Sequence, residues 1–250
     1  MAEISVVIPT FNTAEMTLRC CRSVVDAAEI IVADDGSTDG TAELLAPFAR
    51  VVRLNANRGF AAAANAGVAA ATGRIILLLN SDAVAQPGAL DALVAAFDAD
   101  PKLGVAGARL LNQDGSPQWS GGPTPTLPWM IGAVTGLGRW ARFFRRGGGV
   151  RRDVDWVSGA AMAFRREAWR PLSERYLFYC QDIDFCLAAR DDGWKVRIVE
   201  EARVVHKLGG TSAFDRATLR RDLLTWGRAR YGRAWAMFAW PLLIAIRRRK

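Results

Sequence analysis

The stretch Ile75-Ile76-Leu77-Leu78-Leu79-Asn80-Ser81-Asp82 decides the fold class of this chain. Its first five residues form an unbroken apolar run, which is typical of a buried strand. A carboxylate just beyond the carboxyl end of such a strand occupies a usual place for a ligand site in an open α/β sheet. Asp82 suits a hard divalent cation. Asn, Ser and Asp also form ordinary turns, and on this stretch alone both interpretations stay open.

Further apolar runs alternate with helical segments on both sides of this stretch. We expect strands at 4–8, 30–33 and 51–54, helices at 13–26, 41–48 and 87–98, and an alanine-rich helix that ends near Gly73. This alternation over residues 1–110 predicts a parallel α/β sheet with right-handed crossovers. In such a sheet the strand ends lie on one edge. The polar residues at those ends should therefore converge: Asn12, Asp34, Asp35, Asn57, Arg58 and Asp82.

The rest of the chain is less regular. Residues 113–152 are rich in Gly, Pro, Trp and Arg, and they predict a long excursion with one short amphipathic helix at 129–144. We expect strands at 155–164 and 196–205, separated by a helix that begins at or near Asp182. The only histidine, His206, follows the second of these strands.

Basic charge is concentrated at the C-terminal end. The net charge is +8, and residues 216–250 hold ten basic side chains against one acid, so residues 1–215 are nearly neutral. We expect a basic amphipathic helix at 213–231, followed by a charge-free segment at 234–246 that is too short for a bilayer span of about 20 residues. This tail predicts association with a membrane surface. The alternative is a helix packed on the domain with its arginines in water.

Other compositional features exclude several classes of protein. A nucleic-acid partner is not expected, because nucleic-acid modules usually carry their basic face within the fold. No basic region precedes an apolar stretch at the N-terminus, so no secretory signal is expected. The four cysteines fit no zinc or disulfide spacing and predict reduced thiols in a cytosolic protein.

Seven short motifs occur in a defined order along the chain. They are Pro9-Thr10-Phe11-Asn12, Asp34-Asp35-Gly36-Ser37, Asn57-Arg58-Gly59-Phe60 with Asn65, Leu79-Asn80-Ser81-Asp82, Gly159-Ala160-Ala161-Met162 with Arg165-Arg166, Gln181-Asp182-Ile183-Asp184, and His206 with Gly209-Gly210. Each motif is weak by itself, whereas seven in order are specific. Over residues 3–232 the chain resembles family 2 glycosyltransferases, and in particular their bacterial rhamnosyltransferase-like branch.

The resemblance implies a GT-A fold, which is a Rossmann-like α/β fold with a mostly parallel central sheet flanked by helices. Here an amphipathic helical tail would follow it. The implied catalytic domain is 1–215, with a nucleotide-binding half at 1–110 and an acceptor and catalytic half at 111–215. Residues 216–250 form the tail.

The resemblance also implies an activity, which is inverting transfer of a sugar from a nucleotide-diphosphate donor to a cell-surface glycan or lipid-linked acceptor. A divalent cation, Mg²⁺ or Mn²⁺, would assist. By position, Asp182 matches the catalytic base, and Asp82 and His206 match ligands of the metal or diphosphate. The positions implied around the donor nucleotide are Pro9, Asn12, Asp34, Asp35, Arg58, Asn65 and Asn80. The enzyme is expected in the cytoplasm, peripherally at the inner face of the cell membrane.

Two residues depart from the family pattern. Asn80 replaces the first carboxylate of the Asp-x-Asp motif and leaves Asp82 as its only charged ligand. Gln181 replaces a glutamate, and loss of that like charge should lower the pKa of Asp182 relative to a Glu-Asp pair. The alternatives are a non-catalytic nucleotide-sugar-binding homologue and a nucleic-acid-binding protein that uses the basic tail. The sequence leaves open the donor sugar and base, the acceptor, the linkage and the oligomeric state.

Several of the candidate site residues also have a purely structural interpretation. Asp34 and Asp35 are ordinary turn formers, Asp182 is placed to cap the helix that follows it, and His206 is placed to hydrogen-bond at a strand end.

Overall fold

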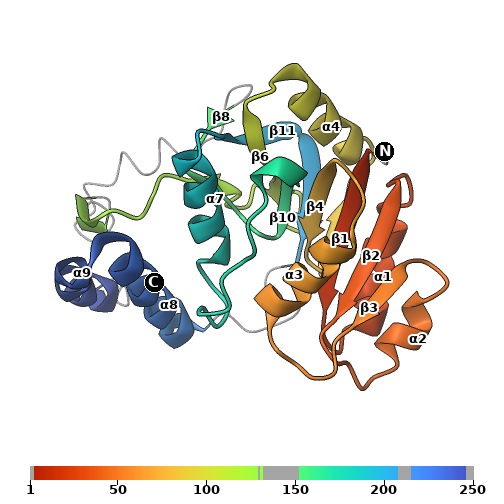
Figure 1. Cartoon of the computed structure of the whole chain (residues 1–250), viewed down its shortest axis with the longest axis horizontal. Coiled ribbons are helices and arrows are strands. Elements are labelled where there is room, and N and C mark those ends of the chain that lie inside the picture. The colour runs from red at the N-terminus through yellow and green to blue at the C-terminus, as the bar shows by residue number, and fades with distance from the viewer. Residues whose placement is uncertain (1–2, 129, 132–151, 208–214, 246–250) are drawn as a thin grey trace.

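The computed structural model describes residues 3–128, 130–131, 152–207 and 215–245, which form a curled mixed sheet with helices on both faces (Figure 1). The strands of the main sheet are β1 (Ile4–Thr10), β2 (Glu29–Asp34), β3 (Arg50–Arg53), β4 (Ile75–Leu79), β5 (Ala83–Ala85), β6 (Leu103–Leu111), β8 (Arg152–Asp153), β10 (Ala161–Arg165) and β11 (Lys195–His206). The helices are α1 (Ala14–Arg22), α2 (Thr41–Leu45), α3 (Phe60–Ala70), α4 (Ala89–Ala99), α7 (Gln181–Asp191), α8 (Arg216–Tyr231) and α9 (Arg233–Ala245).

The order of the strands is β3-β2-β1-β4-β10-β6-β11-β5, and β8 pairs with β11. The first four of these strands are parallel, as the alternation over residues 1–110 predicts. Strand β10 is inserted antiparallel between β4 and β6, and β11 is again parallel to β6. The predicted α/β class is therefore confirmed, and one antiparallel strand joins the two parallel sets.

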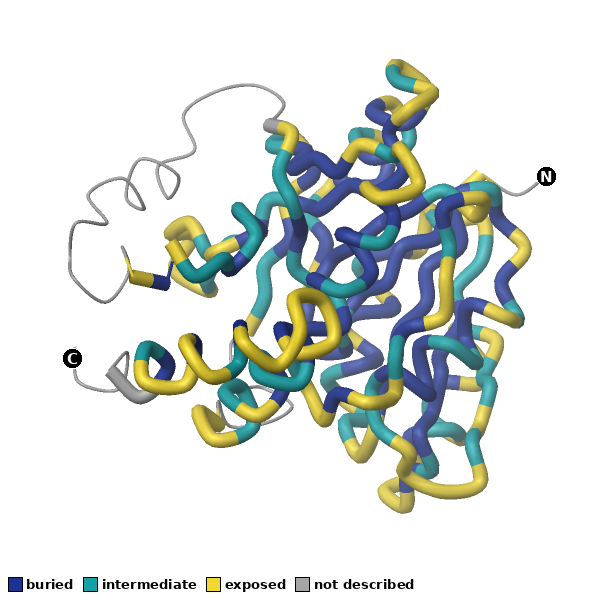
Figure 2. The backbone as a smooth tube through the Cα atoms, turned by 60° about the vertical axis from the view of Figure 1, so that its left-hand side comes forward, coloured by how far each residue is buried: buried dark blue, intermediate teal, exposed yellow. Residues whose placement is uncertain are grey.

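Alternate side chains of β1 enter two different apolar cores, because successive residues of a strand point to opposite faces of the sheet. Val6 and Ile8 pack in the core that also includes residues of α1, α2 and α4. Val7 packs in the core that includes residues of α3 and α7. The buried backbone accordingly fills the centre of the molecule, and exposed segments surround it (Figure 2).

The alanine-rich composition of α3 allows this helix to lie close to the sheet. A Cβ atom on Gly67 would come within 2.4 Å of Val7 Cγ1, and the alanines at 61–64 are buried. This close approach brings the loop that precedes α3 to the end of β2.

The sheet differs from the sequence expectations in two places. The predicted strand at 155–164 is two strands, β9 (Trp156–Val157) and β10, separated by a turn at 158–160. Strand β9 pairs with β7 (Gly121–Gly122) in a small separate sheet. Strand β6, a central strand, was not predicted. Most of the predicted helix at 129–144 lies outside the described residues.

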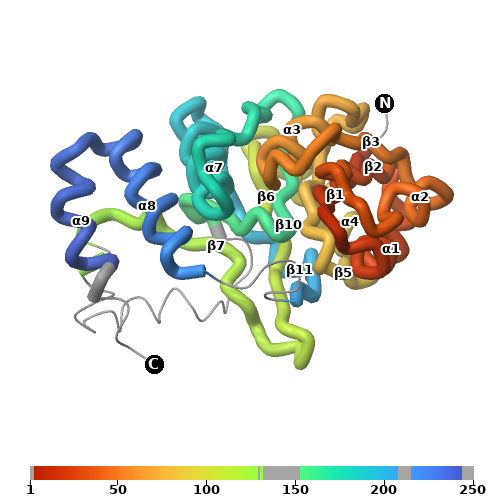
Figure 3. The backbone as a smooth tube through the Cα atoms, turned by 90° about the horizontal axis from the view of Figure 1, so that it is seen from below, coloured from red at the N-terminus to blue at the C-terminus, as the bar shows by residue number. Residues whose placement is uncertain are grey.

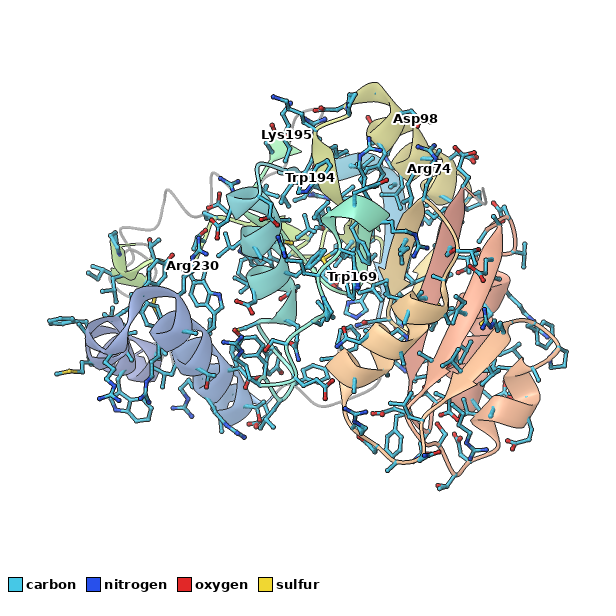
Figure 4. The ribbon with its side chains drawn as sticks, in the orientation of Figure 1. Arg74, Asp98, Trp169, Trp194, Lys195 and Arg230 are labelled. Atoms are coloured by element: carbon cyan, nitrogen blue, oxygen red, sulfur yellow. The ribbon has the colours of Figure 1, made fainter. Side chains whose placement is uncertain are left out.

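The two C-terminal helices, α8 and α9, pack against each other beside α7 (Figure 1). Arg230, labelled in Figure 4, joins α8 to the end of α7 through an ion pair with Asp191, in which Nη2 lies 2.8 Å from Oδ1. Within the described part of the chain, every helix is too short or too polar to cross a bilayer.

Candidate active site

One edge of the sheet collects the carboxyl ends of β1, β2, β4 and β11 and the start of β10, and Figure 3 views the molecule from this side. Arg74 and Lys195 mark the opposite edge, next to the starts of β4 and β11 (Figure 4). The sequence motifs at strand ends therefore come together in space, although they are far apart along the chain.

Asp82 and His206 face each other across this edge. Oδ1 of Asp82 lies 3.3 Å from Nε2 of His206, and the two side chains are only 2% and 11% exposed. The side-chain amide nitrogen of Asn80 lies 3.5 Å from the same ring nitrogen. Oδ1 of Asp82 is buried and has no hydrogen-bond partner among the described residues. Such an oxygen is costly unless a cation or a proton donor reaches it.

The donor set of this pair fits a hard divalent cation that binds together with a diphosphate. Mg²⁺ sites commonly use one or two protein carboxylates and complete their shell with substrate phosphates and water, and Mn²⁺ also takes carboxylate and water ligands. Among the described residues, no group of three His, Cys, Asp or Glu side chains is placed to hold an ion. The chain would thus supply Asp82 and His206 and leave the other coordination positions to the ligand and water.

Asp182 lies in the first turn of α7, beside the turn that precedes β10. Its Oδ2 accepts the N–H of Gly159 at 3.0 Å, and its Oδ1 accepts the N–H of Ile183 at 2.8 Å. The carbonyl of Ala160, next to Gly159, accepts the N–H of Asn80 at 3.0 Å. One short peptide segment therefore joins Asp182 to the turn that carries Asp82.

The pKa of Asp182 is raised, because burial disfavours its charged form, and its backbone N–H donors offset this only in part. A raised pKa suits a carboxylate that must accept a proton, because a base works best when its pKa lies near the operating pH. Burial therefore outweighs the absence of a neighbouring acid at Gln181 in setting the direction of this shift.

Asp34 and Asp35, at the end of β2, order the surrounding loops. Asp35 accepts the N–H groups of Arg58 and Gly59 at 2.8 and 2.7 Å, and thereby holds the backbone at the start of α3. Oδ1 of Asp34 accepts the N–H of Ser37 at 2.9 Å. Its buried Oδ2 has no hydrogen-bond partner within the described chain, although the Arg53 Nε lies 3.4 Å away.

Asn12 and Pro9 belong to the same end of the sheet. Asn12 has a left-handed backbone with φ +51°. Its N–H donates to Ser37 Oγ at 2.9 Å, and its side-chain oxygen accepts the N–H of Thr38 at 2.9 Å. Pro9 is aligned with Ala33 in the pairing of β1 and β2. The loops after β1 and β2 are thus locked to each other.

Arg58 and Asn65 both face the segment that leads to α7. The guanidinium of Arg58 is exposed and pairs with Glu174 at 2.9 Å. The side-chain amide of Asn65 bonds both the N–H and the carbonyl of Leu172, at 2.8 and 2.9 Å. The structure therefore places the Asn65 amide in a contact with this segment and not with Asp82 and His206.

A cluster of hydroxyl groups that sequence reasoning missed ties β1 to the Asp82 turn. Thr10 Oγ1 lies 2.7 Å from Thr13 Oγ1 and 2.8 Å from Thr17 Oγ1, and Thr13 Oγ1 donates to Ser81 Oγ at 3.4 Å. The four-residue spacing of Thr13 and Thr17 on a predicted helix was a usable signal, because such residues share one face.

Gln118 is a second residue that sequence reasoning missed. It lies in the irregular segment after β6, and its side-chain oxygen is 2.7 Å from His206 Nδ1. No periodicity or motif in that segment indicated this contact.

Solved glycosyltransferase structures share the fold. The mannosyltransferase PcManGT from Pyrobaculum calidifontis, solved with GDP-Man and Mn²⁺, matches with a TM-score of 0.63 at 19% identity, over 98% of this chain and 68% of that chain. GalNAc-T7, solved with UDP, GalNAc and Mn²⁺, matches with a TM-score of 0.61 at 19% identity, over 83% of this chain and 43% of that chain. At this level of identity the likeness defines the fold alone, which is GT-A.

Sequence relatives define the family. The chain is 28% identical over 214 residues to N-acetylglucosaminyl-diphospho-decaprenol L-rhamnosyltransferase of Mycobacterium tuberculosis, which covers 76% of this chain and 69% of that protein. It is 34% identical over 105 residues to succinoglycan biosynthesis protein ExoO of Rhizobium meliloti, which covers 39% of this chain and 30% of that protein. The family model of glycosyl transferase family 2 matches residues 5–170. The chain belongs to this family and is a glycosyltransferase.

Proposed function

We propose that this enzyme transfers a sugar, with inversion, from a nucleotide-diphosphate donor to a lipid-linked or cell-surface glycan acceptor. The observation that supports this proposal is the buried Asp82 Oδ1, which lies 3.3 Å from His206 Nε2 and accepts no hydrogen bond from the described residues, on the edge that also carries Asp182. The mycobacterial relative is named as a transferase of L-rhamnose to N-acetylglucosaminyl-diphospho-decaprenol. A rhamnosyl donor and a polyprenyl-diphosphate acceptor are therefore the first pair to test.

Asp182 is the base of the proposed reaction. Its carboxylate takes the proton of the acceptor hydroxyl, whose oxygen forms a bond to the anomeric carbon of the donor sugar. The bond from that carbon to the diphosphate breaks on the opposite face, and the nucleoside diphosphate leaves. The N–H groups of Gly159 and Ile183 hold the carboxylate in place while it accepts the proton.

Asp82 and His206 would hold a divalent cation, Mg²⁺ or Mn²⁺. When bound, such an ion neutralises the negative charge that grows on the leaving diphosphate. Both residues lie at the carboxyl edge of the sheet, where ligands bind in open α/β folds. Residues 1–110 would hold the nucleotide. In this proposal, Asp34 and Asp35 order the loop after β2 and the loop before α3, which would contact the nucleotide.

The helices α8 and α9 would bring the enzyme to the inner membrane surface. The buried face of α9 contains Trp235, Ala239 and Leu243, at a spacing of four residues. On its other side, Met237, Phe238 and Trp240 are 75%, 66% and 53% exposed. Exposed apolar side chains on a helix in a basic tail are typical of helices that lie in a membrane interface. Such a location would place the active site near a lipid-linked acceptor.

A groove of about 600 Å³ between α8 and α9 belongs to this tail and not to the active site. It is lined by Leu224, Thr225, Arg228, Ala236, Met237 and Trp240. Its apolar side chains and its one basic residue, Arg228, suit a lipid with an anionic headgroup.

A transfer assay tests the proposed activity. The purified protein is incubated with dTDP-rhamnose, and in parallel with UDP- and GDP-sugars, plus a polyprenyl-diphosphate-linked acceptor and Mn²⁺. We expect one donor to be consumed and Asp182→Asn to reduce the rate at least about 100-fold, within the usual contribution of a general base. The matched control is Asp184→Asn, two residues further along α7, which should retain most of the rate. Donor binding without turnover by the wild type would instead favour the non-catalytic homologue.

A further inference from the structure

Gln118 makes three side-chain hydrogen bonds, two of which connect it to His206. Its oxygen lies 2.7 Å from His206 Nδ1. Its nitrogen donates to the backbone carbonyl of His206 at 3.1 Å and to the side-chain oxygen of Asn112 at 3.0 Å. A backbone carbonyl can only accept, so this contact requires the nitrogen end of the amide. The oxygen end of Gln118 is therefore the end that faces the imidazole.

The hydrogen bonds around Gln118 form a chain with only one possible direction. Asp114 is an exposed carboxylate and can only accept, so the hydroxyl of Ser116 donates to it at 2.6 Å. Asn112 then donates its side-chain N–H to Ser116 Oγ at 2.9 Å, which leaves the oxygen of Asn112 to accept from Gln118. The amide oxygen of Gln118 finally accepts from Nδ1 of His206. The contact with the His206 carbonyl and the contact with Asn112 thus independently assign the same orientation to the Gln118 amide.

This orientation determines the tautomer of the imidazole. The oxygen of Gln118 can only accept, so His206 Nδ1 must carry the proton. A neutral imidazole has one N–H, and Nε2 therefore presents a lone pair. Nε2 lies 3.3 Å from Oδ1 of Asp82, a buried oxygen that accepts no hydrogen bond within the described parts of the chain. Two electron-pair donors at this distance in a buried setting repel each other unless a proton or a metal cation lies between them.

We propose that Gln118 is a positioning residue that holds His206 in the Nδ1–H tautomer, so that Nε2 serves with Asp82 as a ligand of a divalent cation. This inference rests on the metal of the proposed function. Metal-binding histidines generally donate their other ring N–H to a carbonyl or carboxylate oxygen. Gln118 supplies that oxygen, although it comes from an irregular segment outside the family motifs.

Nuclear magnetic resonance of the ring nitrogens tests the tautomer directly, because His206 is the only histidine among the 250 residues. Untagged protein labelled with ¹⁵N-histidine is measured at about pH 8.5, where an ordinary imidazole is neutral. We expect a protonated Nδ1 and a bare Nε2 in the wild type, and loss of this preference in Gln118→Leu. The control Gln113→Leu changes an exposed glutamine of the same segment and should keep the wild-type spectrum. A protonated Nε2 in the wild type would overturn the inference.

Binding of Mn²⁺ in the presence of a nucleoside diphosphate tests whether the orientation of His206 by Gln118 matters for metal binding. We expect Gln118→Leu to weaken Mn²⁺ binding about 10- to 100-fold, the usual loss when the hydrogen-bond partner of a metal ligand is removed. Gln118→Glu keeps an acceptor for Nδ1–H and should recover the tautomer and part of the affinity. Unchanged Mn²⁺ affinity in Gln118→Leu would overturn the positioning role. If the wild type has an unprotonated Nε2 but binds no Mn²⁺, the metal site of the proposed function is wrong. This outcome differs from the one that would contradict the positioning role of Gln118.

Discussion

The backbone N–H of Gly159 donates to Oδ2 of Asp182 at 3.0 Å, so the turn before β10 holds the proposed base. The next residue, Ala160, accepts the N–H of Asn80. The same three-residue turn that interrupts the predicted strand therefore positions the base relative to the turn with Asp82. A continuous strand across Gly159 would leave the Asp182 carboxylate without this donor.

The raised pKa of Asp182 predicts the pH dependence of the reaction. The base must be ionised to accept a proton, and burial raises its pKa. The rate should therefore fall as the pH drops through this pKa, at a pH above about 4, where an ordinary aspartate titrates. The measurement is the pH profile of kcat/KM for the wild type. An acid limb at or below the ordinary aspartate range would contradict the assignment.

Asp35→Ala should destabilise the nucleotide side of the site. The change leaves the N–H groups of Arg58 and Gly59 without their acceptor, and we expect a loss of about 2 kcal/mol in the free energy of unfolding. Urea denaturation measures this loss. The control is Asp26→Ala at an exposed carboxylate between α1 and β2, which should cost less. Equal losses in both variants would show that Asp35 has no special role at the start of α3.

Asp222 links the tail to the segment that leads into α7. It is fully buried, and its carboxylate accepts the N–H groups of Leu177, Phe178 and Tyr179 at 3.1, 2.9 and 2.8 Å. Asp222→Ala should lower the free energy of unfolding by about 3 kcal/mol, because three donors lose their acceptor. Denaturation with urea measures the loss.

The control for this prediction is Asp215→Ala at the N-cap of the same helix. Asp215 caps α8 through the N–H groups of Ala217 and Thr218, and loss of an exposed cap should cost only about 1 kcal/mol. A cost for Asp222→Ala no larger than this would contradict the prediction that Asp222 holds the segment before α7.

Replacing the exposed apolar side chains of α9 should weaken membrane binding without unfolding the tail. We expect the triple change Met237→Ser, Phe238→Ser and Trp240→Ser to reduce flotation with vesicles that contain anionic lipid. Deletion of α9 is a poorer test, because Trp235 packs on Gly227 and Trp226 and its loss would expose them. The control Val84→Ser changes an exposed apolar side chain of β5. Equal flotation of the triple variant and the wild type would exclude this surface as the membrane contact.

The N-terminal half of the fold could be predicted because its signals are local. The run Ile75–Leu79 matches β4 residue for residue, and each predicted strand end carries its polar residues to the same edge. Strand β6 escaped prediction because Gly104, Gly107 and Arg109 interrupt its apolar run. The predicted helix at 13–26 ends at Arg22, where the backbone N–H and hydroxyl of Ser23 bond the carbonyl of Cys20.

The candidate site was predictable at the level of positions but not of contacts. Motif order proposed Asp82, Asp182 and His206 as members of one site, and their positions could be predicted because each has a fixed place relative to a strand or helix end. It could not show that Asn65 bonds the backbone at Leu172, since that contact joins residues more than a hundred positions apart. The role of Gln118 could not be predicted either, because it depends on contacts with His206, a residue far away in the sequence.

Nucleotide binding with and without Mn²⁺ tests the central claim most directly. Calorimetry on the wild type with UDP, dTDP and GDP should find one nucleotide that binds in a Mn²⁺-dependent manner. Asp82→Asn should weaken this binding about 10- to 100-fold, because loss of a charged contact costs about 1.5–3 kcal/mol. Asp91→Asn, at an exposed carboxylate of α4, should bind as the wild type does. If no nucleotide binds, or if Asp82→Asn binds as tightly as the wild type, the metal and diphosphate site assigned to Asp82 is wrong.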